Sequence, residues 1–198
     1  ASKALKQKDS SEFYNYVYAN LKKIMTAIVL GIIAFMPIIF PILIKGEFTQ
    51  AYLYIPILIV ATYYSNISGF FGGIFAAHKV TKIMGSTTVI SAAINIVINF
   101  IFIRFIGVWA AALSTLIATS TVYLIRKREL KKYLKINDHK SIITMVVFII
   151  LIITYYLNKL MINVCMAILI TIYCVYINKD ILKIIINKMK GKFEKNEI

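Results

Sequence analysis

Four uncharged polar residues recur along the segment Ser86–Phe100, STTVISAAINIVINF, in a region without any charged residue. They are Thr88, Ser91, Asn95 and Asn99. On a helix that turns by about 100° per residue, their side chains fall in a narrow band on one face. Hydroxyl and carboxamide groups donate and accept hydrogen bonds, with one another or with water. The chemistry of this band is therefore recognition by hydrogen bonding.

The band has two interpretations, because a polar group left unsatisfied in lipid costs several kcal/mol and must face other helices or water. The first is hydrogen bonding between neighbouring helices, which contributes about 0.6 kcal/mol per contact. The second is the wall of a hydrated cavity. Two asparagines one helical turn apart exceed what plain packing requires, but the sequence leaves both interpretations open.

A second predicted helix carries small residues at helical spacing, Gly69 and Gly72 among them. Small residues let helix backbones approach closely, so we expect a packing contact here, with a sliding gate as the alternative. Asn66 lies in the same helix and is a further polar residue for a cavity wall. These three residues extend the candidate site to a second helix.

Three prolines, Pro37, Pro41 and Pro56, lie in the first two predicted helices. Proline removes a backbone hydrogen bond and bends a helix, so each is either a plain kink or a bend that lets a bundle rock between two states. Arg104 lies at the outer end of the third predicted helix. Its guanidinium either reaches the membrane interface or attracts an anion at the mouth of a pore.

No constellation of catalytic residues accompanies this band. The predicted membrane-spanning runs contain no Asp or Glu, both histidines lie in loops, and the sequence has no P-loop, nucleophile elbow, HExxH or CxxC motif. Cys165 and Cys174 lie in one predicted helix and suit apolar packing. We therefore expect no enzyme activity, no cofactor and no metal site.

The composition indicates which elements must position these side chains. The chain has 198 residues, of which 60% are hydrophobic, and its mean hydropathy is +0.80. Only 16% are charged, against about a quarter in soluble domains. Long charge-free runs separate the charged clusters: Ile24–Ile44, Phe48–Ala77, Ile83–Ile103, Phe105–Ile125, Ser141–Asn158 and Leu160–Asn178. About 20 apolar residues cross a bilayer as a helix, so the sequence predicts six transmembrane helices, the second preceded by an interfacial stretch.

The basic residues predict the orientation of these helices. If the N-terminus is cytoplasmic, all but three of the 23 Lys and Arg residues lie in cytoplasmic segments. The exceptions are Lys45, Arg104 and Lys159. The positive-inside rule then predicts a multi-pass protein with both termini in the cytoplasm. The net charge of +15 suits anionic lipid headgroups, and we expect no nucleic-acid partner because no loop is long enough to fold alone.

These observations divide the chain into five segments. Residues 1–23 form an amphipathic cytoplasmic lead-in that runs along the headgroups into the first helix, and residues 24–125 form four transmembrane helices. A basic cytoplasmic loop at 126–140 separates them from a transmembrane hairpin at 141–178. The basic tail, 179–198, is partly amphipathic and is expected to lie on the membrane surface.

Two stretches carry a family resemblance. MPIIFPILIKGEFTQAYLYIPILIV places proline in a helix before a Gly-x-Phe turn. AINIVINFIFIRFIGVWAAALSTLIAT places an Asn-x-x-x-Asn helix before a short turn that ends in Gly107, followed by a helix of small residues. This order resembles the C-terminal part of bacterial polysaccharide and oligosaccharide-lipid flippases, in the multidrug/oligosaccharidyl-lipid/polysaccharide exporter superfamily.

The resemblance implies an all-α membrane fold of fourteen helices in two bundles around a cavity, of which these six are the last. The missing N-terminal bundle would be a partner. The implied function is to move undecaprenyl-diphosphate-linked oligosaccharide across the bacterial inner membrane by alternating access, for surface polysaccharide synthesis. Asn95 and Asn99 would suit sugar hydroxyls. The alternatives are a multidrug or cation antiporter of the same superfamily, which would need acidic residues in its spans, and an assembly subunit that transports nothing.

Overall fold

The computed structural model describes residues 2–134 and 141–193, and this part of the chain is predominantly helical. Its elements are α1 (Ser2–Leu43), η1 (Gly46–Leu53), α2 (Ile55–Ala77), α3 (Lys82–Ile106), α4 (Val108–Leu130), α5 (Ser141–Leu157), α6 (Leu160–Ile177) and α7 (Lys179–Phe193). Five helices, α1 to α4 and α6, are long and apolar enough to cross a membrane. The chain is therefore a membrane protein by the length and composition of its helices.

The fifth predicted span, α5, is shorter than the others. It has 17 residues and a length of about 26 Å, whereas the hydrocarbon core of a bilayer is about 30 Å thick. The prediction of six spans is thus met for five helices and falls at the lower limit of length for α5. Its first residue follows the segment 135–140, which lies outside the described residues.

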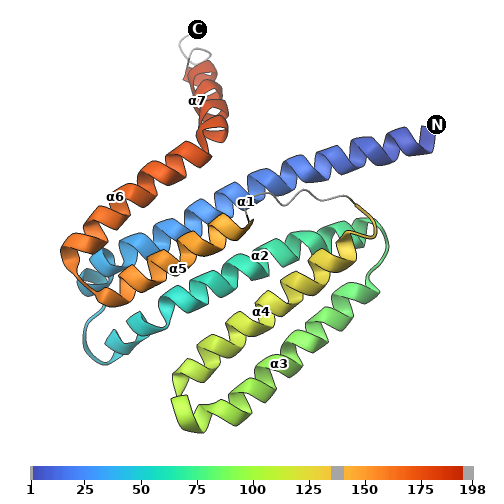
Figure 1. Cartoon of the computed structure of the whole chain (residues 1–198). Helices are drawn as coiled ribbons and strands as arrows, with labels where there is room; N and C mark the ends of the chain where they lie inside the picture. Colours follow the sequence, from blue (N-terminus) through green and yellow to red (C-terminus); the bar gives the residue numbers. More distant parts are fainter. Residues whose placement is uncertain (1, 135–140, 194–198) are drawn as a thin grey trace.

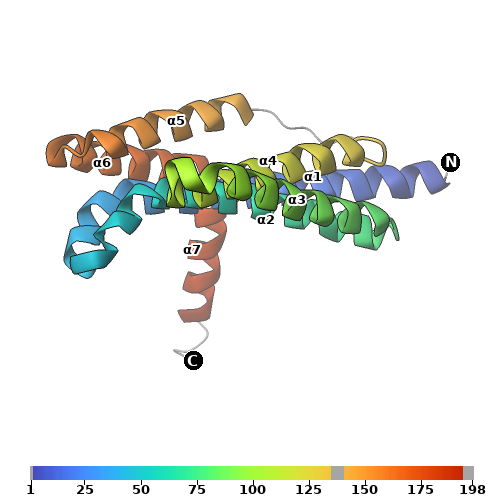
Figure 2. The same ribbon diagram turned by 90° about the horizontal axis from the view of Figure 1, so that it is seen from below.

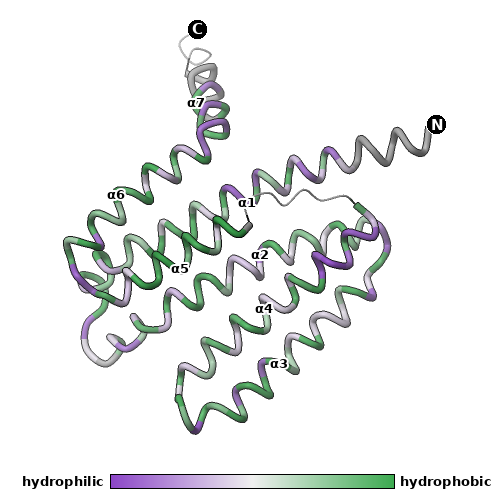
Figure 3. The backbone as a smooth tube through the Cα atoms, viewed as in Figure 1, coloured by the Kyte–Doolittle hydropathy of each residue, from purple (hydrophilic) through white to green (hydrophobic). Residues whose placement is uncertain are grey.

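The helices α1 to α6 run back and forth along a common direction, and α7 turns away from them (Figures 1 and 2). Within this arrangement α1 lies between α2 and the α5–α6 hairpin, and α4 lies between α2 and α3. α3 is consequently an edge helix, and Thr87 is the one buried side chain among its described residues. Hydrophilic residues gather at the C-terminal end of α4 and at the α2–α3 turn (Figure 3).

The predicted lead-in and the first span form one continuous helix. With 42 residues, α1 is about 63 Å long, about twice the thickness of the hydrocarbon core. Tyr18 is only 1% exposed, and its ring lies 5.4 Å from that of Phe71 and 6.1 Å from that of Phe70. Aromatic packing thus holds the part of the predicted lead-in near Tyr18 against the end of α2.

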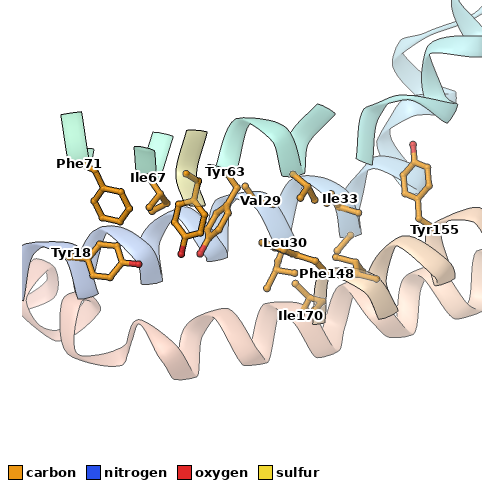
Figure 4. Packing of buried hydrophobic residues seen from close by; sticks show 14 of the residues in the cluster. Tyr18, Val29, Leu30, Ile33, Tyr63, Ile67, Phe71, Phe148, Tyr155 and Ile170 are labelled. Carbon is orange, nitrogen blue, oxygen red and sulfur yellow. The ribbon is translucent and has the colours of Figure 1, made fainter. Parts of the chain in front are cut away.

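The apolar core is centred on α1, where it meets α2 and the α5–α6 hairpin (Figure 4). Leu30 and Ile33 have no exposed surface, and Phe148 of α5 and Ile170 of α6 are 3% and 5% exposed. Many dispersion contacts between these interlocking side chains hold the helices together, because lipid tails are as apolar as the side chains themselves. This core fixes α1 as the central helix.

Two links between helices agree with the expected turns. The predicted interfacial stretch is η1, which ends before α2 begins at Ile55. A single residue, Gly107, separates α3 from α4, with φ +55° and ψ −135°. Side chains disfavour such a conformation, so glycine permits this tight reversal. Of the expected turn Arg104–Gly107, the first three residues belong to α3, and the reversal that places α3 antiparallel to α4 occurs at Gly107.

The prolines occupy two kinds of position. Pro37 and Pro41 lie inside α1, as predicted. Pro56 lies in the first turn of α2, where a missing N–H group removes no helical hydrogen bond. The predicted bend at Pro56 is therefore wrong: this residue begins a helix.

The end of the bundle away from α7 is tied together by aromatic rings. Tyr52 of η1 stacks on Tyr155 of α5 at 4.3 Å between ring centres, and the Tyr155 hydroxyl donates to the Tyr52 carbonyl oxygen at 2.7 Å. The Tyr156 hydroxyl donates to the carbonyl oxygen of Leu53 at 2.7 Å. Burial raises the pKa of Tyr52 above its usual value, so this phenol stays neutral at physiological pH. These contacts fasten the α5–α6 hairpin to the link between α1 and α2.

Candidate functional site

A cavity of about 410 Å³ opens between α2, α3 and α4 and is called the polar groove below. Its lining is mostly small or polar, with one positive charge: Ser65, Ser68, Gly69, Thr88, Ser91, Ala92, Asn95, Thr119, Val122 and Arg126. Each of the three helices contributes at least one hydroxyl group. The edge position of α3 leaves this space unfilled, because α3 packs closely on α4 and meets α2 mainly near one end.

The α3 wall of the polar groove carries three of the four residues of the polar band. Thr88, Ser91 and Asn95 line the cavity, as expected for residues on one helical face. The Thr88 hydroxyl also donates to the carbonyl oxygen of Met84 at 2.9 Å, within its own helix. A hydroxyl that donates to its own helix still has lone pairs that face the cavity and can accept a hydrogen bond.

Asn99, the fourth residue of the band, lies in the contact between α3 and α4. Its Nδ2 donates to Oδ1 of Asn95 at 2.7 Å and to the Ser114 hydroxyl at 2.8 Å. The Ser114 hydroxyl lies 3.1 Å from the same Oδ1, and Nδ2 of Asn95 lies 3.4 Å from the Thr115 hydroxyl. The two interpretations of the band thus apply to different residues: Asn99 joins helices, and Asn95 both joins helices and lines the groove.

Arg126 closes one end of the polar groove and is 9% exposed. Its Nε donates to the Thr87 hydroxyl at 2.9 Å, and its Nη1 donates to the Ser68 carbonyl oxygen at 2.9 Å. Nη2 lies 3.4 Å from the Met84 carbonyl oxygen. All three acceptors are neutral, and no acidic side chain that the structure describes pairs with this guanidinium. The groove therefore contains a positive charge that the described helices leave uncompensated.

The glycines of α2 make room for this arginine and for the groove. A Cβ atom at Gly72 would lie 3.3 Å from Nη1 of Arg126 and 3.4 Å from Cε of Met84. A Cβ atom at Gly69 would meet nothing within 4 Å, because Gly69 lines the open groove. The small residues thus accommodate a side chain and a cavity here, whereas the sequence predicted a close approach of helix backbones.

The remaining predicted site residues lie elsewhere. Asn66 is exposed on a different face of α2, and its Nδ2 donates to the Thr62 carbonyl oxygen at 2.9 Å. Arg104 is exposed at the far end of α3 from Arg126. Pro37, Pro41 and Pro56 do not line the polar groove. The structure therefore brings together Thr88, Ser91, Asn95 and Gly69 and leaves Asn66 and Arg104 apart from them.

Sequence reasoning missed Arg126, because it was counted as the first basic residue of a cytoplasmic loop. A signal was present in the spacing of α4. Thr115, Thr119, Val122 and Arg126 are separated by four, three and four residues, so they share one helical face. A positive charge that continues a polar face is an indication that the arginine points inward.

The polar groove can bind a ligand that combines negative charge with hydrogen-bonding groups. The described residues contain no group of three or more His, Cys, Asp or Glu that could hold a metal ion. The lining offers one guanidinium, several hydroxyls and one carboxamide, which suit recognition. Comparison of the chain with protein-family models, with curated proteins and with solved structures gives no match.

Proposed function

We propose that this chain is the C-terminal part of a flippase of the bacterial inner membrane. In this proposal it moves undecaprenyl-diphosphate-linked oligosaccharide by alternating access, for the synthesis of surface polysaccharide. The observation that carries the proposal is the polar groove, in which an uncompensated Arg126 lies beside a row of hydroxyl and amide groups. This combination matches a diphosphate joined to a sugar.

The guanidinium of Arg126 has N–H donors that make no hydrogen bond to the protein. Arginine carries five N–H donors, and three of its nitrogen atoms already donate one hydrogen bond each to protein. One N–H on each of Nη1 and Nη2 is left for a ligand. Paired N–H groups bind phosphate oxygens well, because the planar fork matches their spacing. These two donors are our proposed contact for the diphosphate.

The groove continues from this charge along α3. Thr88 and Asn95 are separated by about 10 Å along the helix, at about 1.5 Å per residue. This length of wall has room for one or two sugar rings beyond the proposed diphosphate contact. Sugar hydroxyls donate and accept hydrogen bonds and so match Ser91 and the Asn95 carboxamide. No Asp or Glu is among the described residues of the lining, and the antiporter alternative would need one there.

The proposed orientation of the helical bundle in the membrane favours entry of the substrate from the cytoplasm. Ring contacts link Tyr14 of α1 to His78 at 6.2 Å and His78 to Tyr133 at 6.4 Å, so the basic ends of α1, α2 and α4 meet at one end of the bundle. Arg126 lies toward this same end. By the positive-inside rule we propose that this end and both termini are cytoplasmic. Cysteine labelling tests this: Gly46→Cys should react with an impermeant reagent outside the cell, and Ser10→Cys should not.

The exposed apolar face of α3 is an argument that a further helical bundle packs beside this chain. Val89, Ile96 and Phe100 are 69%, 68% and 78% exposed. In the proposed flippase, lipid and the N-terminal bundle implied by the family resemblance cover this face. The polar groove would then lie in the cavity between two bundles, where alternating access opens it to each side of the membrane in turn.

The function is tested by removing the charge of the groove in the full-length protein. We expect Arg126→Gln to reduce export of surface polysaccharide about tenfold or more in cells that lack another flippase, because a hydrogen bond to a charged group contributes about 1.5–3 kcal/mol. Arg128→Gln is the matched control, since Arg128 lies two residues after Arg126 in the same helix and is exposed. Equal amounts of each variant in the membrane must be verified. Normal export by Arg126→Gln would refute the proposed role.

A further inference from the structure

A second cavity, of about 610 Å³, lies where α1, α5, α6 and the start of α7 meet, and is called the corner pocket below. Its described lining shares no residue with the polar groove. The walls include tyrosines and aliphatic side chains, such as Tyr173 and Ile177. The corner pocket therefore offers a site separate from the proposed transport path.

The corner pocket is positively charged. Lys22, Lys23 and Lys179 line it, together with one acidic residue, Asp180. Nζ of Lys23 lies 3.8 Å from Oδ2 of Asp180, and these side chains are 39% and 65% exposed, so solvent weakens the ion pair. Nζ of Lys179 lies 5.4 Å from the centre of the Tyr176 ring, which holds this charge at the rim. Among the described lining residues three are lysines and one is acidic, which favours an anionic ligand.

A hydroxyl in the lining suits the same kind of ligand. Thr26 lines the corner pocket, and its hydroxyl is not among the fully buried side-chain atoms that lack a hydrogen-bond partner, so it borders the open space of the pocket. A hydroxyl at this position can donate a hydrogen bond to an anionic oxygen. Lys22 precedes Thr26 by one helical turn and lies on the same face of α1. The hydroxyl and the ammonium groups can thus approach one phosphate group.

The course of α7 sets the depth of the corner pocket in the membrane. α7 turns away from the direction shared by α1 to α6 (Figures 1 and 2), as expected for a helix on the membrane surface beside a bundle that crosses the membrane. A basic helix with apolar residues such as Ile181 and Leu182 suits the boundary between headgroups and acyl chains. The corner pocket, at the start of α7, is then at the depth of the phospholipid phosphates.

We propose that the corner pocket binds the headgroup of an anionic phospholipid. The phosphate lies among Lys22, Lys23 and Lys179, and the Thr26 hydroxyl donates to one of its oxygens. The glycerol backbone packs against the tyrosines and Ile177. Basic pockets between membrane helices bind anionic headgroups in this way. The site anchors the α1, α5, α6 and α7 junction to the lipid surface and does not depend on the proposed transport function.

Lipid binding to the purified full-length chain tests this inference. Native mass spectrometry and the thermal unfolding midpoint in detergent are measured with added phosphatidylglycerol, phosphatidylcholine or inorganic phosphate. We expect retention of phosphatidylglycerol and a raised midpoint, with no such effect from the other two. Lys22→Gln with Lys179→Gln should weaken phosphatidylglycerol binding about 25-fold, at about fivefold per lysine. Lys45→Gln with Lys159→Gln, at the other end of the bundle, is the matched control and should leave binding unchanged.

Thr26→Val is a second variant, which keeps the volume of the side chain and should therefore fold normally. It should weaken binding of phosphatidylglycerol about tenfold, since a hydrogen bond to a charged group is lost. Arg126→Gln should leave this binding unchanged, which separates the inference from the proposed transport. Equal binding of both lipids, or an equal loss in the control variant, would overturn the lipid site. Displacement of the lipid by inorganic phosphate would assign the pocket to a soluble anion instead.

Discussion

Contacts of two kinds join the helices on either side of α2. Across α2, α3 and α4 the chain uses a polar network, in which Arg126 bridges three helices and Asn99 joins α3 to α4. Across α1, α5 and α6 the contacts are mainly aliphatic and aromatic, with Leu30 and Phe148 almost completely buried. The first region contains the polar groove. In the second region the side chains around Leu30 and Phe148 fill the space between the helices, and the corner pocket lies at the end where α7 begins.

This difference has a physical cause. Apolar side chains interlock and leave little space, so they supply packing energy but no room for a polar ligand. Hydrogen bonds fix partners at a few points and leave the intervening surface polar, which allows water or a ligand to occupy it. We therefore expect substitutions in the apolar region to act mainly on stability, and substitutions in the polar region to act mainly on transport.

The largest loss of stability is expected from the apolar region. Phe148→Ala should lower the free energy of unfolding by about 3 kcal/mol, because it leaves a cavity beside α1. Ile149→Ala is the matched control, since Ile149 is 55% exposed and should cost much less. Unfolding in detergent with increasing denaturant measures both. Similar losses for the two variants would contradict the assignment of this region as the packed core.

Substitutions in the polar region should reduce export strongly and stability only slightly. Asn95→Leu with Asn99→Leu should cost only about 1 kcal/mol of stability, at about 0.6 kcal/mol per interhelical contact, yet should abolish polysaccharide export. Membrane insertion should be intact. Asn66→Leu is the control, because Asn66 is exposed and lies outside the polar groove. If the double variant exports normally, these asparagines act only in packing.

Substitutions at the two glycines of α2 test whether export depends on the position of the Arg126 guanidinium. Gly72→Ala should shift the guanidinium, because the added Cβ would lie 3.3 Å from Nη1, and we expect export to fall several-fold. Gly69→Ala should have little effect on stability or export, since its Cβ meets nothing within 4 Å. Export assays at matched protein levels compare the two. A stronger effect at Gly69 than at Gly72 would argue that groove width matters more than the position of the guanidinium.

The smallest effect is expected from the contact between α3 and α4. Ser114 has no exposed surface and its hydroxyl bonds to both asparagines. Ser114→Ala should lower the free energy of unfolding by about 0.6 kcal/mol and leave export nearly unchanged. Ser120→Ala, one to two turns along α4, serves as the reference. A large loss of export at Ser114 would place this contact within the transport path.

The membrane helices could be predicted from the sequence because charged residues rarely occur in lipid. The charge-free run Ile83–Ile103 lies within α3, and the run Leu160–Asn178 ends one residue beyond α6. The same reasoning began the first span at Ile24, after Lys22 and Lys23, and expected the lead-in to run into it; α1 is indeed continuous through both lysines. Charge marks depth in the membrane but does not end a helix.

The candidate site was predicted only in part from the sequence. Helical periodicity gives the direction of a side chain, which placed Thr88, Ser91 and Asn95 on one wall. It does not identify the neighbouring helix, so the sequence could not distinguish the groove at Asn95 from the helix contact at Asn99. Arg126 was missed because a basic residue at a helix end is usually solvated, and its burial depends on the space at Gly72.

The central claim is that the polar groove contains water and accepts an anion. It is tested most directly by thiol labelling of Ser91→Cys in a variant without Cys165 and Cys174, with Phe100→Cys as the exposed residue on the outer face of α3. The thiolate is the nucleophile that attacks a water-soluble thiol reagent, and it forms only where water reaches. We predict rapid labelling at position 91 that inorganic pyrophosphate slows, and no labelling at position 100. An unreactive thiol at position 91, or labelling that pyrophosphate leaves unchanged, would contradict the claim.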